Sequence, residues 1–81
     1  ELIETPLFKM APNPTSDELN ISGVEGMINK VSVYDSSGRL ILQEMGISST
    51  QRLDVSTLES GVFILEIETN KGVARKEFVK Y

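Results

Sequence analysis

The sequence predicts an all-β domain, an immunoglobulin-like antiparallel β-sandwich of about seven short strands. Three observations predict it. Apolar residues alternate with polar ones, turn residues interrupt this alternation every eight to twelve positions or so, and no segment shows helical periodicity. The chain of 81 residues contains no Cys and no Trp. The disulfide and buried tryptophan of antibody domains are therefore absent, and the likeness concerns architecture alone.

The first two expected strands are Leu7–Met10 and Glu18–Ser22. The segment Pro12-Asn13-Pro14 ends the first strand, because proline has a fixed φ and no N–H, and it pushes the preceding residue toward an extended conformation. We interpret this segment as a stiff exit that cannot extend a hydrogen-bonded ladder. A direct docking contact with a partner is the alternative interpretation.

The next two expected strands are Ile28–Tyr34 and Arg39–Glu44, joined by a turn at Asp35–Gly38. Gly38 is expected to adopt a left-handed conformation there. Acidic and hydroxyl groups before a glycine also suggest a calcium loop, but the closing glutamate of the twelve-residue loop is missing. Arg39 beside the turn is expected to be a solvated charge rather than an anion site.

Gln51–Val55 and Val62–Thr69 are the fifth and sixth expected strands, the latter with Phe63, Leu65 and Ile67 on one face and Glu66 and Glu68 on the other. The connection Ser56–Gly61 between them is expected to turn Leu58 inward. Gly61 is expected to let the chain turn where a side chain would clash.

The last expected strand is Val73–Lys80, after the turn Asn70-Lys71-Gly72. Asn and Gly tolerate the positive φ that tight hairpins require, so this turn is a strong hairpin signal.

Charge is unevenly distributed. Residues 1–70 carry four basic against eleven acidic groups, a net −7, whereas residues 71–81 carry four basic groups against one acidic group, a net +3. One explanation is that Lys and Arg protect an edge strand from aggregation and pair with Glu66 and Glu68 across the hairpin. The other is a recognition surface for an acidic receptor, and the two explanations are compatible.

Composition excludes several classes of function. The chain has no His and no Cys, which removes Ser–His and Cys–His nucleophiles, thiolate metal sites and His-based zinc or haem ligation. The surplus of acidic residues argues against nucleic-acid binding. No apolar run is long enough to cross a bilayer, so no direct membrane insertion is expected. A paired-carboxylate site needs a cleft that so small a sandwich rarely has, so we expect neither enzyme activity nor a cofactor.

Three stretches of the sequence together resemble a known family: Lys9–Ile21 (KMAPNPTSDELNI), Val31–Ile41 (VSVYDSSGRLI) and Leu53–Leu65 (LDVSTLESGVFIL). In this order, and followed by a basic last strand, they resemble the type A C-terminal sorting domain of type IX secretion substrates in Bacteroidota. The resemblance covers about residues 7–81. It implies that residues 1–6 are the end of a linker from an upstream cargo domain and that 7–81 form the sorting domain.

The resemblance also implies a role. Such domains are small immunoglobulin-like sandwiches at the C-terminus of a cargo protein that crosses the inner membrane by the general secretory route. The implied partners are the outer-membrane machinery of type IX secretion, a shuttle protein and a sortase-like peptidase, which commonly removes the domain and attaches the cargo to a surface lipopolysaccharide. The implied location is the periplasm in transit and then the outer membrane, cell surface or extracellular space. The family's Gly-x-Tyr is Gly61-Val62-Phe63 here, which loses a hydroxyl but keeps the ring.

We expect recognition by backbone and charge, centred on the final hairpin Val62–Tyr81. An edge strand offers unpaired N–H and C=O groups to a receptor strand, and Arg75, Lys76 and Lys80 would orient its docking. Tyr81 is expected to be the native terminus. The candidate recognition residues are Pro12, Asn13, Pro14, Gly38, Arg39, Gly61, Val62, Phe63, Lys71, Gly72, Arg75, Lys76, Lys80 and Tyr81.

Two other classes of function remain open at this point. One is a carbohydrate-binding or adhesive module of a secreted protein, against which the absence of Trp counts, since such modules usually display an aromatic platform. The other is a structural or dimerising module, for which an exposed edge strand would support a weak homodimer.

Overall fold

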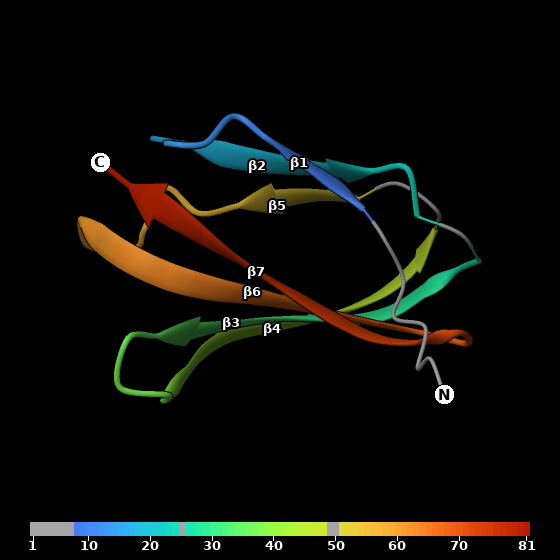
Figure 1. Ribbon diagram of the computed structural model, residues 1–81. Helices are drawn as coiled ribbons and strands as arrows, with labels where there is room; N and C mark the ends of the chain where they lie inside the picture. Colours follow the sequence, from blue (N-terminus) through green and yellow to red (C-terminus); the bar gives the residue numbers. More distant parts are fainter. Residues whose placement is uncertain (1–7, 25, 49–50) are drawn as a thin grey trace, which may run out of the picture.

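Two antiparallel sheets face each other in the computed structural model, which describes residues 8–24, 26–48 and 51–81. Figure 1 shows them as two layers, a three-stranded sheet in the order β1-β2-β5 and a four-stranded sheet in the order β4-β3-β6-β7. The strands are β1 Lys9–Ala11, β2 Glu18–Ser22, β3 Ile28–Asp35, β4 Leu40–Ser48, β5 Gln51–Asp54, β6 Gly61–Thr69 and β7 Gly72–Lys80. The predicted sandwich is confirmed.

Most strand limits agree with the sequence pattern to within two residues. The exception is β4, which was expected to end at Glu44 and continues to Ser48. It is longer because the start of β3 pairs with it, with Ile28 opposite Ser48. The expected start of the first strand, Leu7, lies outside the described residues. In the part of the chain that the structure describes, no helix is long and apolar enough to cross a membrane.

The core lies between the two sheets and follows the predicted alternation. Every second residue of β2 and β6 points into it, and Leu58 in the β5–β6 connection is buried as expected. In β3 the alternation holds for Val31 and Val33, whereas Ile28 enters the core three residues earlier because the register shifts between Ile28 and Lys30. The buried apolar side chains are Phe8, Leu19, Ile21, Val24, Ile28, Val31, Val33, Leu53, Val55, Leu58, Phe63, Leu65, Ile67, Ala74 and Phe78.

The β3–β4 turn is capped by the side chain of Asp35. Its Oδ1 accepts hydrogen bonds from the N–H groups of Ser37 and Arg39, each at 2.9 Å, and from the Ser37 hydroxyl at 2.6 Å. The hydroxyl bond, and then the bond from the Arg39 N–H, lower the pKa of Asp35 below its usual value. Gly38 has a φ of 91°, which confirms the left-handed conformation expected for this turn.

Two expectations about turn residues need correction. Asn70 does not carry the positive φ of the β6–β7 hairpin, which falls on Gly72 with a φ of 138°. A side chain at Gly61 was expected to clash, yet an added Cβ would meet only an atom of the Phe63 ring, 4.0 Å away. The requirement for glycine at this position comes instead from its φ of 153°.

Candidate recognition site

The final hairpin forms one side of the four-stranded sheet. Strand β7 pairs with β6 along its whole length, from Thr69 opposite Gly72 to Gly61 opposite Lys80. Strand order places β7 at the edge of the sheet, so its second row of backbone groups points away from β6. What covers that row decides whether a partner strand can bind there.

The C-terminal part of this edge is already occupied. Thr15 lies beside Lys80 in a parallel bridge, its N–H donates to the Val79 carbonyl, and its own carbonyl accepts from the Tyr81 N–H, both at 2.9 Å. The carboxamide of Asn13 accepts from the Val79 N–H at 3.0 Å and donates to the Glu77 carbonyl at 3.4 Å. We call residues 13–15 the edge strap. The expectation that the last strand presents an unused edge is therefore wrong for its C-terminal part.

The remaining part of the edge is short. Along an edge strand, the N–H and C=O groups of successive residues point alternately to the neighbouring strand and to the free edge. Those of Val79 and the N–H of Tyr81 point away from β6, toward the edge strap. The same alternation directs the N–H and C=O groups of Val73 and Arg75, and the N–H of Glu77, to the free edge. Within the described chain, nothing is bonded to these groups on that side. We call Val73–Glu77 the open segment.

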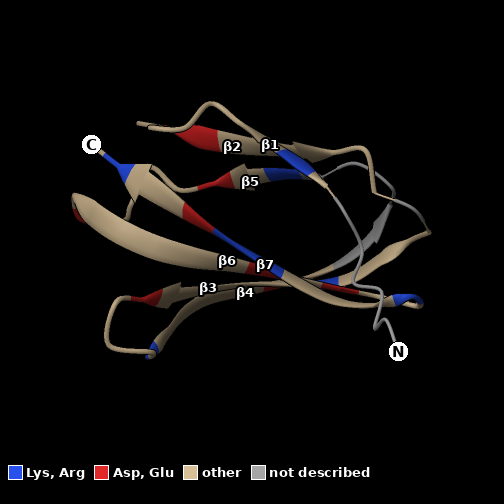
Figure 2. Ribbon diagram, in the orientation of Figure 1, with Lys and Arg blue, Asp and Glu red and all other residues tan. Residues whose placement is uncertain are grey.

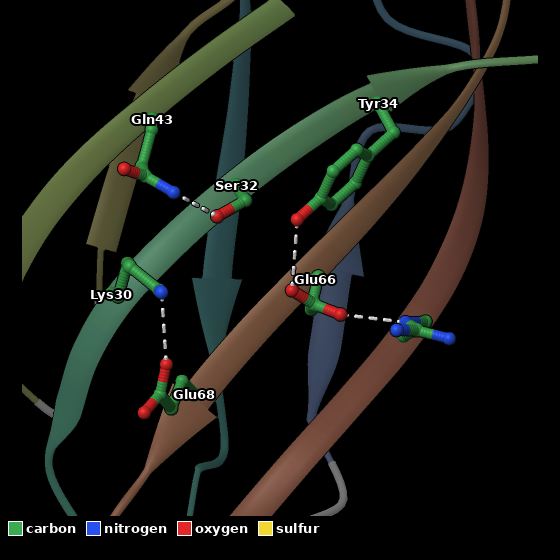
Figure 3. A network of polar contacts seen from close by, with 7 residues as sticks. Lys30, Ser32, Tyr34, Gln43, Glu66 and Glu68 are labelled. Atoms are coloured by element: carbon green, nitrogen blue, oxygen red, sulfur yellow. Dashed lines mark hydrogen bonds and ion pairs between the residues drawn. The ribbon is translucent and has the colours of Figure 1, made fainter. Parts of the chain in front are cut away.

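The outer face of this sheet carries a row of polar contacts. The Tyr34 hydroxyl donates to Glu66 at 3.3 Å (Figure 3). Glu66 in turn forms an ion pair with Arg75 at 2.6 Å. The prediction that basic residues of β7 pair with Glu66 is thus confirmed. Glu68, by contrast, pairs with Lys30 of β3 at 3.2 Å, so the expected contact between Glu68 and β7 is wrong.

Two lysines of β7 lie on its core-facing side. Lys76 stays exposed, with its ammonium 5.1 Å from the centre of the Phe8 ring. Lys80 is only 7% exposed, and its Nζ donates to the carbonyl oxygens of Leu58 at 3.0 Å and Tyr81 at 3.2 Å. The expectation that Lys80 contributes a surface charge is therefore wrong. Inward-pointing charged residues are a known way to protect an edge strand from further pairing.

The other candidate residues lie in two places. Gly38 lines a groove together with Arg75 and Lys76, whereas Arg39, Gly61, Val62 and Phe63 line a second groove. Arg39 is exposed at the opposite end of sheet β4-β3-β6-β7, where it pairs with Asp35 at 3.3 Å, in agreement with a solvated charge. Phe63 is buried and stacks on Phe78, with the ring centres 5.7 Å apart. Val62 and Tyr81 are exposed. Figure 2 shows basic segments along β7 and in the β6–β7 turn. With Lys80 buried, the accessible basic residues of the hairpin are Lys71, Arg75 and Lys76.

A shallow groove lies beside the open segment. Its volume is about 560 Å³, and its lining includes Tyr34, Ile64, Arg75 and Glu77. Sequence reasoning did not single out Thr15 as part of this site. The available signal was the β-branched side chain of Thr15, which favours an extended conformation able to pair with another strand.

Comparison with known proteins gives the family. The profile described as "Secretion system C-terminal sorting domain" matches residues 9–81, and no curated protein matches. Among solved structures, a chain of PorZ from Porphyromonas gingivalis, described as "an essential bacterial surface component of the type-IX secretion system", is similar in fold. The TM-score is 0.74 and the sequence identity is 20%, over 91% of this chain and 11% of that one. Because the profile matches residues 9–81, this chain belongs to the family of secretion system C-terminal sorting domains.

Proposed function

We propose that this domain directs a cargo protein, joined upstream of Leu7, through the type IX secretion system. The cargo passes through the periplasm and reaches the outer membrane, the cell surface or the extracellular space. A sortase-like peptidase then removes the domain. Membership of the sorting-domain family over residues 9–81 supports this proposal, and the likeness to a domain-sized part of PorZ supports the fold on which it rests.

The outer-membrane machinery and its shuttle protein recognise the β6–β7 hairpin in this proposal. The observation that carries it is the position of three accessible basic residues, Lys71, Arg75 and Lys76, beside unpaired backbone of the last strand. Elsewhere the protein is acidic. Backbone pairing makes few demands on side-chain identity, which suits a signal shared by many cargo proteins.

The test is a fusion of residues 1–81 to the C-terminus of a fluorescent protein that folds in the periplasm. In a host with a type IX system, we expect the reporter to appear at the cell surface without the sorting domain. In the same host lacking the outer-membrane machinery, the uncleaved fusion should stay in the periplasm. Retention of the intact fusion in the periplasm of the competent host would contradict the proposal.

Deletion of the last strand is a poor test of recognition. Residues Ala74 and Phe78 of β7 are part of the core, so removal of the strand would unfold the domain and abolish export for a trivial reason. Point substitutions on the free edge avoid this difficulty.

A further inference from the structure

We infer that the partner strand binds β7 at the end nearest the hairpin turn, over Val73–Glu77, and that this partner segment is extended and carries carboxylates. The inference rests on the proposed function and names the docking position and the chemistry of the partner. It differs from the expectation that the last residues of the chain are the docking element.

Backbone geometry limits where a strand can be added. Past Glu77, the edge groups of β7 are bonded to Asn13 and Thr15. Thr15 is held firmly, because it is 1% exposed and its hydroxyl donates to the carbonyl of Glu18 in β2. A partner strand on Val79 would have to break these contacts, whereas one on the open segment breaks no backbone contact of the residues that the structure describes.

Charge selects the chemistry of the partner. Lys71 lies in the turn at the start of the open segment, and Arg75 and Lys76 lie within it, all three exposed. Arg75 stays 69% exposed although it contacts Glu66, so its remaining N–H groups are available to a second carboxylate. Glu77, at the boundary with the edge strap, is the one acidic residue of β7. A segment with carboxylates on alternate residues therefore fits better than a neutral or basic one.

The other edge of the same sheet provides a control surface. Strand β4 lies there and has no Lys, Arg or Pro in its sequence. Its exposed side chains include Leu40, Ile41 and Met45. Strand β4 itself offers no basic side chain to an acidic strand, so both edges offer backbone groups but only β7 carries basic residues within the strand.

A peptide titration tests the inference on the isolated 81-residue chain. The probes are two synthetic eight-residue peptides, one alternating Thr with Glu and one alternating Thr with Lys. With the Glu peptide, we expect amide chemical-shift changes in residues 71–77, weakening as salt rises, and no such changes with the Lys peptide. Changes centred on β4 or on Val79 and Tyr81, equal effects of both peptides, or no change at millimolar peptide would overturn the inference.

Proline substitution tests the same site in export. Proline is tolerated in edge strands where the N–H faces solvent, so Val73→Pro should remove an edge donor and leave the bonds to β6 in place. Met45→Pro is the matched control, because the alternation directs the Met45 N–H away from β3. We expect Val73→Pro to reduce export of the reporter about fivefold or more, as loss of one bond implies, and Met45→Pro to leave it unchanged. Equal export of both variants would overturn the inference.

A charge variant covers the case in which a proline variant does not fold. Arg75→Glu and Arg52→Glu each reverse one exposed arginine and break one ion pair, with Glu66 and Glu18 respectively. Only Arg75→Glu should reduce export.

The proposed function and the proposed docking position fail in different experiments. If the unsubstituted fusion is not exported, the proposed function is wrong. If it is exported and Arg75→Glu is exported equally well, only the docking position is wrong.

Discussion

The two edges of the four-stranded sheet, β4 and β7, are protected in different ways. Strand β7 carries inward-facing lysines and is covered at its C-terminal end by the edge strap. Strand β4 exposes apolar side chains, but its pairing with β3 has two register irregularities, and Glu44 lies opposite the buried Val31. Inward-facing charged side chains, a covered edge and register irregularities each reduce unwanted pairing of an edge strand. Strand β7 is therefore covered at its C-terminal part and stays open over Val73–Glu77 only.

The largest expected effect concerns the anchoring of the two edge strands in the core. Phe78 of β7 is fully buried and stacks on Phe63, whereas Leu42 of β4 is half-buried at the margin of the core. Phe78→Ala should lower the free energy of unfolding by about 3–5 kcal/mol. Leu42→Ala should cost clearly less, because the half-buried Leu42 side chain buries less apolar surface on folding than Phe78 does. Urea unfolding at neutral pH measures both, and equal costs would contradict the view that β7 is the more firmly anchored edge.

The next effect concerns Lys80, a lysine at an inward-facing position of β7 where a sandwich usually has an apolar residue. Lys80→Ala removes the donor to the Leu58 carbonyl and leaves that buried region with an unsatisfied acceptor, at a cost of about 1–3 kcal/mol. Lys76→Ala is the matched control, since Lys76 also faces inward but stays exposed. We expect it to lose only the contact with the Phe8 ring, at about 0.5 kcal/mol. Similar losses in both variants would show that the Lys80 contact contributes nothing specific.

A smaller effect is expected at the edge strap. Asn13→Ala removes the acceptor for the Val79 N–H, which should cost about 1 kcal/mol and increase hydrogen exchange at the Val79 amide. Asn13→Asp keeps that acceptor and loses only the long contact to the Glu77 carbonyl, so exchange at Val79 should change less. Unchanged exchange in Asn13→Ala would mean that Thr15 alone holds this part of the edge closed.

Much of this arrangement follows from local sequence pattern. The faces of β2, β3 and β6, the inward Leu58 and the capped turn at Asp35–Gly38 depend on alternation and turn chemistry within a few residues. The length of β4 does not, because it depends on the pairing of Ile28 with Ser48. Strand limits set by a distant partner are invisible in the strand itself.

The recognition site was predicted only in outline. The basic hairpin and its Arg75–Glu66 pair follow from charge and register. The edge strap does not, because it joins residues more than sixty positions apart in the chain. The burial of Lys80 was missed for a similar reason. A lysine in a strand pattern is expected in solvent, and the Leu58 carbonyl that it bonds comes from the β5–β6 connection, 22 positions away in the chain.

The smallest expected effect is a difference in pH dependence between the turns that precede the two edge strands. The turn before β4 is capped by the carboxylate of Asp35, and the turn before β7 by the hydroxyl of Thr69, which accepts from the Lys71 N–H at 2.9 Å. Because its hydrogen bonds lower the pKa of Asp35 below 3.8 in the folded protein, the unfolded chain binds more protons in that range. The stabilisation by Asp35 is therefore complete above about pH 4 and is lost as the pH falls through the lowered pKa.

The difference in unfolding free energy between the unsubstituted protein and Asp35→Asn should accordingly be constant near neutral pH and should shrink below pH 4. Thr69→Val at the other turn is the control, since its hydroxyl does not titrate and the difference that it causes should not depend on pH. Asp54, whose pKa is lowered by the Ser56 hydroxyl and N–H, is kept in both variants, so its own titration cancels. A pH-independent effect of Asp35→Asn would show that the carboxylate charge does not matter to the turn, and that the two edge strands begin from equivalent caps.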